Sequence, residues 1–150
     1  MDHHRASSRT VFMLVRESSD TFFVLETTHV ANAGLTFGVL EDAPFHVPTV
    51  LFMIGSAIGL GMVLWVLKRT APSELVLRLG ALVGGAGMIG NLIDRLRLGY
   101  VIDWIGLRWN VFGWRFEVPT FNIADLLICA GIVVIAAILG KRWLTSRAHS

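Results

Sequence analysis

Three aspartates stand where long apolar runs of this sequence begin or end, and carboxylates in such places can carry chemistry. Asp94 occurs in GNLIDR, Asp103 in GYVIDWI and Asp125 in FNIAD. An ionisable group inside a membrane helix costs roughly 2.5–3.5 kcal/mol near the helix centre and less toward an end. Because charges at such positions are usually functional, these three residues are the first candidates for a site.

Asp103 and Asp125 are the two carboxylates best suited to act together. Asp125 lies about one helical turn inside an apolar run, and Asn122 precedes it by three residues on the same helical face. Asp103 lies in a short apolar stretch that indicates a strand at the membrane surface. Two carboxylates in a partly dry site do not easily both ionise, so one keeps a proton. Such a pair can activate a water and polarise a carbonyl, which predicts peptide hydrolysis near a membrane surface.

The same residues also allow a purely structural explanation. Asn122 is suited to cap the N-terminus of a helix, and Asp125 would then be favoured in its first turn by the helix dipole. Asp103 would be a solvated loop acid. Asp94 would pair with one of the arginines that follow or precede it, namely Arg95, Arg97 or Arg78.

The elements that carry these residues are predicted to be membrane helices. Hydrophobic residues make up 54% of the 150 residues, whereas about 45–50% is typical of soluble proteins even with glycine counted. A bilayer core of about 30 Å needs roughly 20 apolar residues in a helix, and three segments qualify, at 47–67, 75–93 and 121–140. The sequence therefore predicts one membrane-embedded domain, an α-helical integral membrane protein with three transmembrane helices.

The remaining segments are predicted to be extracytoplasmic, apart from a polar N-terminal segment at 1–16. Residues 17–46 mix β-branched, aromatic and polar types, which indicates strands and a turn at residues 32–34. Residues 94–120 form a second outer segment, expected as a loop, and the two segments together predict a small β-sheet over the helix ends. Six basic residues at one membrane face against four at the other favour the first face as cytoplasmic.

Several classes of partner and cofactor are not expected. The formal charge of +2 and the absence of a dense basic patch argue against nucleic acid. The single cysteine, Cys129, excludes an intrachain disulfide, and the five histidines show no metal-ligand spacing. We therefore expect no metal and no other cofactor.

Taken in order, NAGLTFG, GNLIDR, GYVIDWI and FNIAD resemble the motif series of lipoprotein signal peptidase, also called signal peptidase II. The resemblance runs from about residue 21 to residue 140. It implies an intramembrane aspartic endopeptidase of the bacterial inner (cytoplasmic) membrane, monomeric among the membrane lipids, with its active site toward the extracytoplasmic face. The implied substrate is a prolipoprotein that carries a diacylglyceryl group, from which the signal peptide is removed.

Motif by motif, the resemblance implies that Asp103 and Asp125 are the catalytic pair. Asn32 matches a polar residue near the substrate, and Asn122 matches the asparagine beside the second aspartate. The residues that match GNxxDR are expected to support and line the site; they are Gly90, Asn91, Asp94 and Arg95. For Asp94, a structural ion pair with an arginine is the expected role.

The resemblance departs from the family pattern in two ways. Family members normally have four membrane helices, the first with a DQxxK-type motif, and this sequence has three spans and no such motif. The link between Asp103 and Asp125 is also a few residues longer than expected. Two alternatives therefore stay open, a non-catalytic lipoprotein-binding relative and a small membrane transport subunit. Transport would require a polar path that reaches both membrane faces.

Overall fold

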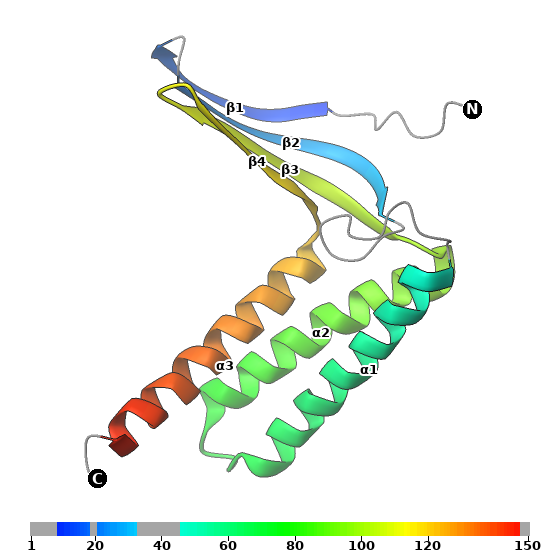
Figure 1. Cartoon of the computed structure of the whole chain (residues 1–150), viewed down its shortest axis with the longest axis vertical. Helices are drawn as coiled ribbons and strands as arrows, with labels where there is room; N and C mark the ends of the chain where they lie inside the picture. The colour runs from blue at the N-terminus through cyan, green and yellow to red at the C-terminus, as the bar shows by residue number, and fades with distance from the viewer. Residues whose placement is uncertain (1–8, 19–20, 33–45, 148–150) are drawn as a thin grey trace. The chain divides into compact units, whose positions relative to one another are not determined.

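The described part of the chain forms a four-stranded sheet and three long helices. The computed structural model describes residues 9–18, 21–32 and 46–147. In chain order the elements are β1 (Arg9–Ser18), β2 (Thr21–Asn32), α1 (His46–Arg69), α2 (Leu75–Leu98), β3 (Val101–Val111), β4 (Trp114–Phe121) and α3 (Ile123–Arg147) (Figure 1). The chain divides into two compact units, the first with the sheet and the second with most of the helices.

All three helices are long and apolar enough to cross a membrane, over Thr49–Arg69, Leu75–Leu98 and Ile123–Arg147. Each span has 21 to 25 residues, whereas about 20 suffice for a bilayer core. The predicted fold class, an α-helical membrane protein with three spans and a small sheet, is thus confirmed. The side of the membrane on which the sheet lies stays a prediction.

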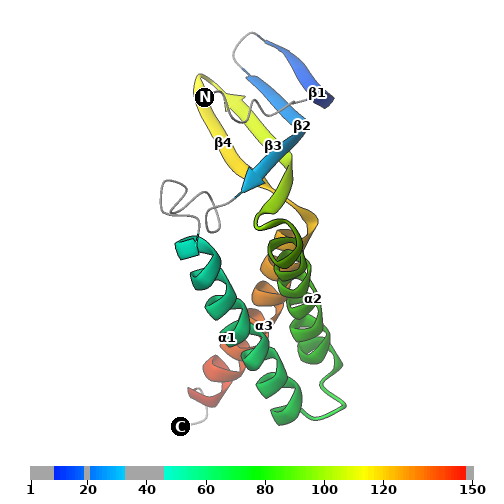
Figure 2. The same cartoon turned by 90° about the vertical axis from the view of Figure 1, so that its right-hand side faces the viewer.

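Within the second unit, α2 is the central helix and contacts both others (Figures 1 and 2). Over the most apolar 18 residues of each helix, 39% of the residues of α2 are buried, compared with 6% for α1 and 6% for α3. A methyl group on Gly85 would lie 3.3 Å from Val63 of α1, and one on Gly84 would lie 3.5 Å from Gly131 of α3. Small residues therefore let both neighbouring helices approach α2 closely, as is usual between helices in lipid.

The contact between α2 and α3 depends on backbone atoms that meet without side chains between them. A methyl group on Gly131 would lie 2.6 Å from the carbonyl oxygen of Gly80 and 2.6 Å from the Cα of Gly84. One on Gly87 would collide with the carbonyl oxygen of Ala124, in the first turn of α3. Neither helix can accept a larger residue at these positions without moving away from the other.

The connection between α1 and α2 is held by a cation at the end of α1. The guanidinium of Arg78 donates hydrogen bonds to the carbonyl oxygens of Leu67 (2.9 Å) and Thr70 (3.0 Å). The last carbonyls of a helix lack partners within the helix, and a cation there also suits the helix dipole. An ion pair between Glu74 and Arg142 ties the same connection to the end of α3.

The sheet of the first unit is antiparallel throughout, in the order β1-β2-β3-β4. Val24 on β2 and Val101 on β3 are buried and form part of its core. The strand β3 is central to the site because it follows α2 after two residues and pairs with both β2 and β4.

Several boundaries differ from those expected from the sequence. The expected polar segment at 1–16 contains most of β1, and the expected loop at 94–120 contains the end of α2, all of β3 and most of β4. Polar residues can occupy a strand that has one exposed face, so average polarity did not distinguish strand from loop. Likewise α2 continues past residue 93, because backbone hydrogen bonding continues where the apolar run stops. Of the expected turn at 32–34, Asn32 ends β2 and the rest lies outside the described residues.

A substitution that adds one methyl group at the α2–α3 contact should destabilise the protein. We expect Gly131→Ala to lower the free energy of unfolding by about 1–3 kcal/mol, because overpacking forces the two backbones apart. Gly140→Ala is the matched control on the same helix, since a methyl group there would meet nothing within 4 Å. Thermal unfolding in detergent micelles measures both. Equal midpoints for the two variants would contradict this account of the contact.

Candidate functional site

Asp103 is a buried carboxylate that is held by two asparagine side chains. It is 3% exposed. Asn32 donates from Nδ2 to Oδ2 of Asp103 at 2.9 Å, and Asn122 donates from Nδ2 to Oδ1 at 3.1 Å. Hydrogen bonds to an ionised acceptor are among the stronger ones in proteins, and burial increases their weight. The two amides therefore fix the carboxylate and compensate much of the solvation that it loses.

The pairing of the strands explains how these three residues meet. Asp103 is opposite Val30 of β2, and Val101 is opposite Asn32. Residues two apart in a strand point to the same face, so Asn32 is the diagonal neighbour of Asp103. Asn122 arrives from the other side, because it directly follows β4, the other neighbour of β3.

A buried guanidinium accompanies this carboxylate. Arg95 is 4% exposed and interacts electrostatically with Asp103. It lies near the end of α2, where Gly99 has a φ of 83° and donates its N–H to the carbonyl oxygen of Arg95 at 3.0 Å. This left-handed glycine ends the helix in the usual way. The chain then turns directly into β3 and reaches Asp103 four residues later.

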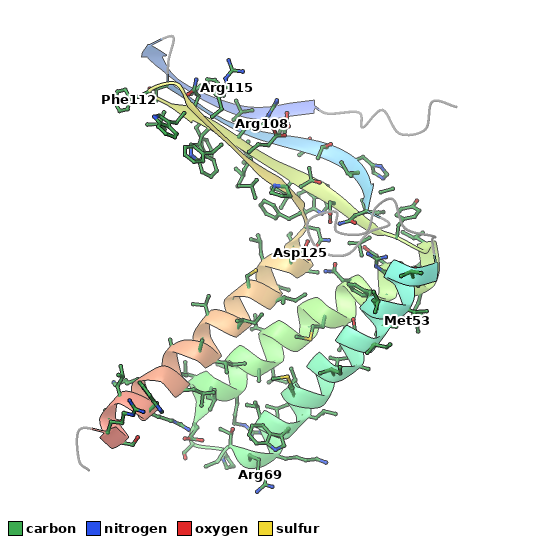
Figure 3. All side chains as sticks on the ribbon, in the orientation of Figure 1. Met53, Arg69, Arg108, Phe112, Arg115 and Asp125 are labelled. Atoms are coloured by element: carbon green, nitrogen blue, oxygen red, sulfur yellow. The ribbon has the colours of Figure 1, made fainter. Side chains whose placement is uncertain are left out.

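Asp125 is held by a different asparagine. It is the third residue of α3, in the first turn, where an acidic side chain suits the helix dipole (Figure 3). Asn91 of α2 is 3% exposed and donates from Nδ2 to Oδ1 of Asp125 at 2.8 Å. Asn122 directly precedes Ile123, in the position from which a side chain can cap a helix, and its amide group contacts Asp103.

Glycines of α2 make the Asn91–Asp125 contact possible. A methyl group on Gly90 would lie 3.3 Å from the Cβ of Ala124, and one on Gly87 would collide with the backbone of the same residue. Gly90 thus supports the site by packing. Sequence reasoning did not single out Gly87 or Gly131, although Gly87 lies three residues from both Gly84 and Gly90, a spacing that places all three on one helix face.

The predicted site residues thus fall into two groups, one in each unit. Asn32, Arg95, Asp103 and Asn122 belong to the first unit, and Gly90, Asn91 and Asp125 belong to the second. Asp94 is half-buried near the end of α2, and the ion pair expected for it is not seen among the described residues. Arg78, one of its expected partners, lies in the first turn of α2 and instead contacts the backbone at the end of α1.

The chemistry available to these groups is that of carboxylates, amides and one guanidinium. Over residues 9–18, 21–32 and 46–147, no cluster of three or more His, Cys, Asp or Glu side chains is placed to hold a metal ion. A carboxylate fixed by N–H donors can accept a proton or orient a water molecule.

Lipoprotein signal peptidases of several bacteria are similar in sequence to this chain. A lipoprotein signal peptidase of Syntrophotalea carbinolica is 33% identical over 107 residues, which cover 71% of this chain and 63% of that protein. One of Desulforapulum autotrophicum is 37% identical over 107 residues, or 71% of this chain and 64% of that protein. The chain therefore spans less than two thirds of the length of both relatives.

A solved structure, described as a bacterial membrane enzyme determined by the in meso method at 2.3 Å resolution, is also similar. It is 31% identical with a TM-score of 0.65, over 78% of this chain and 66% of that one. The family model for signal peptidase (SPase) II matches residues 6–140, and the chain belongs to this family.

Proposed function

We propose that this chain is an endopeptidase that removes the signal peptide from diacylglyceryl-modified prolipoproteins, with Asp103 and Asp125 as its catalytic pair. The observation that carries the proposal is that each aspartate accepts a hydrogen bond from an asparagine of its own unit, in a chain whose family match runs from residue 6 to 140. The similarity to lipoprotein signal peptidases supports the substrate class.

Covalent connectivity supports the pairing of the two aspartates. Asn122 is hydrogen-bonded to Asp103 and precedes Asp125 by three residues. Three peptide units limit the separation of the Cα atoms of Asn122 and Asp125 to about 11 Å. A residue that binds one carboxylate and is tethered so closely to the other is suited to position both around one substrate bond.

In the proposed mechanism, Asp103 and Asp125 hold one water molecule and share one proton. The ionised carboxylate takes a proton from the water as its oxygen attacks the scissile carbonyl carbon. The protonated carboxyl group donates its proton to the carbonyl oxygen, which forms a tetrahedral diol. Collapse of the diol breaks the C–N bond, and the leaving amine takes up a proton from the carboxyl group that had accepted one. The other carboxylate takes back a proton from a hydroxyl group of the diol, which becomes the new carbonyl and restores the starting protonation of the pair.

The asparagines and Arg95 have positioning and binding roles in this proposal. Asn32 and Asn122 keep the oxygens of Asp103 oriented, and Asn91 does the same for Asp125. Arg95 contributes a positive charge beside Asp103. A fixed geometry reduces the reorganisation required in the transition state, which is the main way that such groups contribute to rate.

The membrane supplies the substrate in this proposal. The acyl chains of the prolipoprotein stay in the bilayer while its peptide enters the site laterally, from the extracytoplasmic side of the bacterial inner membrane. The chain acts as a monomer and requires neither a metal nor another cofactor.

Replacement of either aspartate by asparagine should remove peptidase activity. We expect Asp103→Asn and Asp125→Asn each to reduce the rate of cleavage of a diacylated prolipoprotein by at least about 10²–10⁴-fold, because general acid–base catalysis is lost. The substitutions conserve size, so both variants should fold. Asp103→Asn should nevertheless lower the thermal midpoint in detergent, because one of the two asparagine donors then faces an NH2 group instead of an acceptor oxygen. Appearance of the released signal peptide on a gel measures the rate.

Glu117→Gln is the matched control, because Glu117 is an exposed carboxylate on β4, and it should cleave at the rate of the unmodified chain. Activity within about twofold of that rate in either aspartate variant would contradict the catalytic pair. Substrate binding without cleavage by the unmodified chain would indicate a non-catalytic relative instead.

The Asn91–Asp125 hydrogen bond should affect turnover more than binding. A hydrogen bond to a charged group contributes about 1.5–3 kcal/mol, so we expect Asn91→Ala to lower kcat by roughly 10- to 100-fold. KM for the prolipoprotein should stay nearly constant, since Asn91 is assigned to position Asp125. Ser56→Ala removes another buried polar side chain, on α1, and should leave kcat unchanged. A change confined to KM would rule out the positioning role.

A further inference from the structure

The β3–β4 hairpin ends in a turn whose sequence does not suit its backbone. Phe112 and Gly113 form the two-residue turn, with φ values of 50° and 84°. Two positive φ values are typical of a type I′ turn, whose first central position is usually Asn, Asp or Gly. Among the described residues, Phe112 is the non-glycine residue with a positive φ. A bulky aromatic side chain in this conformation is strained, and such strain often marks a functional position.

The same turn exposes a large apolar surface to its surroundings. Phe112 is 83% exposed and Trp114 is 73% exposed, and Phe112 projects from the tip of the hairpin (Figure 3). Val111 and Phe116 are also exposed, at 40% and 48%. Folding of the sheet therefore does not explain why these residues are apolar, because they bury little of their surface within it.

The two faces of the hairpin differ sharply in polarity. Cross-strand partners share a face, and successive residues of a strand alternate between faces. One face therefore carries Trp109, Val111, Trp114 and Phe116, with the rings of Trp109 and Phe116 stacked 5.6 Å apart. The opposite face carries Arg108, Asn110, Arg115 and Glu117. The hairpin is thus amphipathic along its outer length and ends in an aromatic residue.

We propose that the tip of this hairpin inserts into the polar–apolar interface of the lipid bilayer and anchors the sheet to the membrane surface. Tryptophan and other amphipathic aromatic residues favour this interface, and arginine beside them can contact lipid phosphates. Arg115, next to Trp114 in the chain, is exposed and suited to that contact.

The bilayer is within reach of the hairpin through the chain itself. Two residues separate the end of the α2 span from β3, and one residue separates the end of β4 from the α3 span. The 11 residues of β3 extend about 35 Å, so the tip reaches the interface only when the strands run along the membrane surface. The proposal rests on the sheet and the spans alone and is independent of the peptidase function.

Spin labelling in proteoliposomes tests the proposal. Cys129 is exposed within the span of α3, so the nitroxide-labelled natural chain serves as the reference for a lipid environment. In a Cys129→Ala background, Phe112→Cys and Glu117→Cys place one label each at the tip and on the polar face. We expect the label at position 112 to be at least about threefold less accessible to a water-soluble nickel chelate than the label at 117. It should remain accessible to oxygen, which concentrates in lipid.

Two results would overturn the proposal. One is nickel accessibility at position 112 equal to that at 117, which would place the tip in water. The other is an immobilised label protected from both nickel and oxygen, which would show that protein or bound peptide covers the tip instead.

A second variant separates membrane contact from folding. Phe112→Asn introduces the residue that the turn prefers, so the thermal midpoint in detergent should stay equal or rise. Quenching of Trp114 fluorescence by brominated lipids, taken as the difference between each protein and its Trp114→Phe derivative, should nevertheless fall about twofold. Unchanged quenching would contradict an anchoring role for Phe112.

Discussion

The close approach of α2 and α3 is the constraint on which the contact between Asn91 and Asp125 depends. Their backbones meet at Gly80, Gly84 and Gly131, where no side chain intervenes. Only at this separation can the short side chain of Asn91 reach Asp125, at 2.8 Å. Lipid provides no hydrophobic driving force between helices, so van der Waals contact and hydrogen bonds must hold such helices together. Packing and site geometry therefore depend on the same glycines.

In the sheet, the pairing of strands positions the hydrogen-bond partners of Asp103. A buried carboxylate is costly unless N–H donors replace its lost water. Strand pairing brings Asn32 from β2, and the end of β4 brings Asn122, so long-range backbone pairing supplies both donors. Gly99 allows α2 to end abruptly enough for β3 to follow at once. The position of Asp103 thus depends on helix termination as well as on the register of the strands.

The hairpin tip illustrates how a membrane protein can place apolar residues outside its spans. Phe112 and Trp114 are more exposed than most apolar residues of a folded sheet, and Phe112 also occupies a strained turn. Neither feature contributes to the stability of the sheet in water. Insertion into a bilayer surface, as proposed, would bury the exposed rings and so offset the cost of the strained turn.

The sequence by itself determined the three membrane spans found among the described residues, because apolar runs of about 20 residues are satisfied in lipid only as helices. It also identified Asp103, Asp125 and Asn122 as candidates, since ionisable and amide groups beside such runs are costly unless they have a role. It indicated a strand around Asp103 and a small sheet, but it did not determine where the strands at 9–18, 101–111 and 114–121 begin and end, because their mixed polarity is equally compatible with loops. Which asparagine binds which carboxylate was decided only by tertiary structure. Asn91 contacts Asp125, which is 34 residues away in the chain, because α2 packs against α3. Asn32 contacts Asp103, which is 71 residues away, because of the register between β2 and β3. Contacts over such separations depend on how whole elements pack, and no local pattern in the chain specifies them.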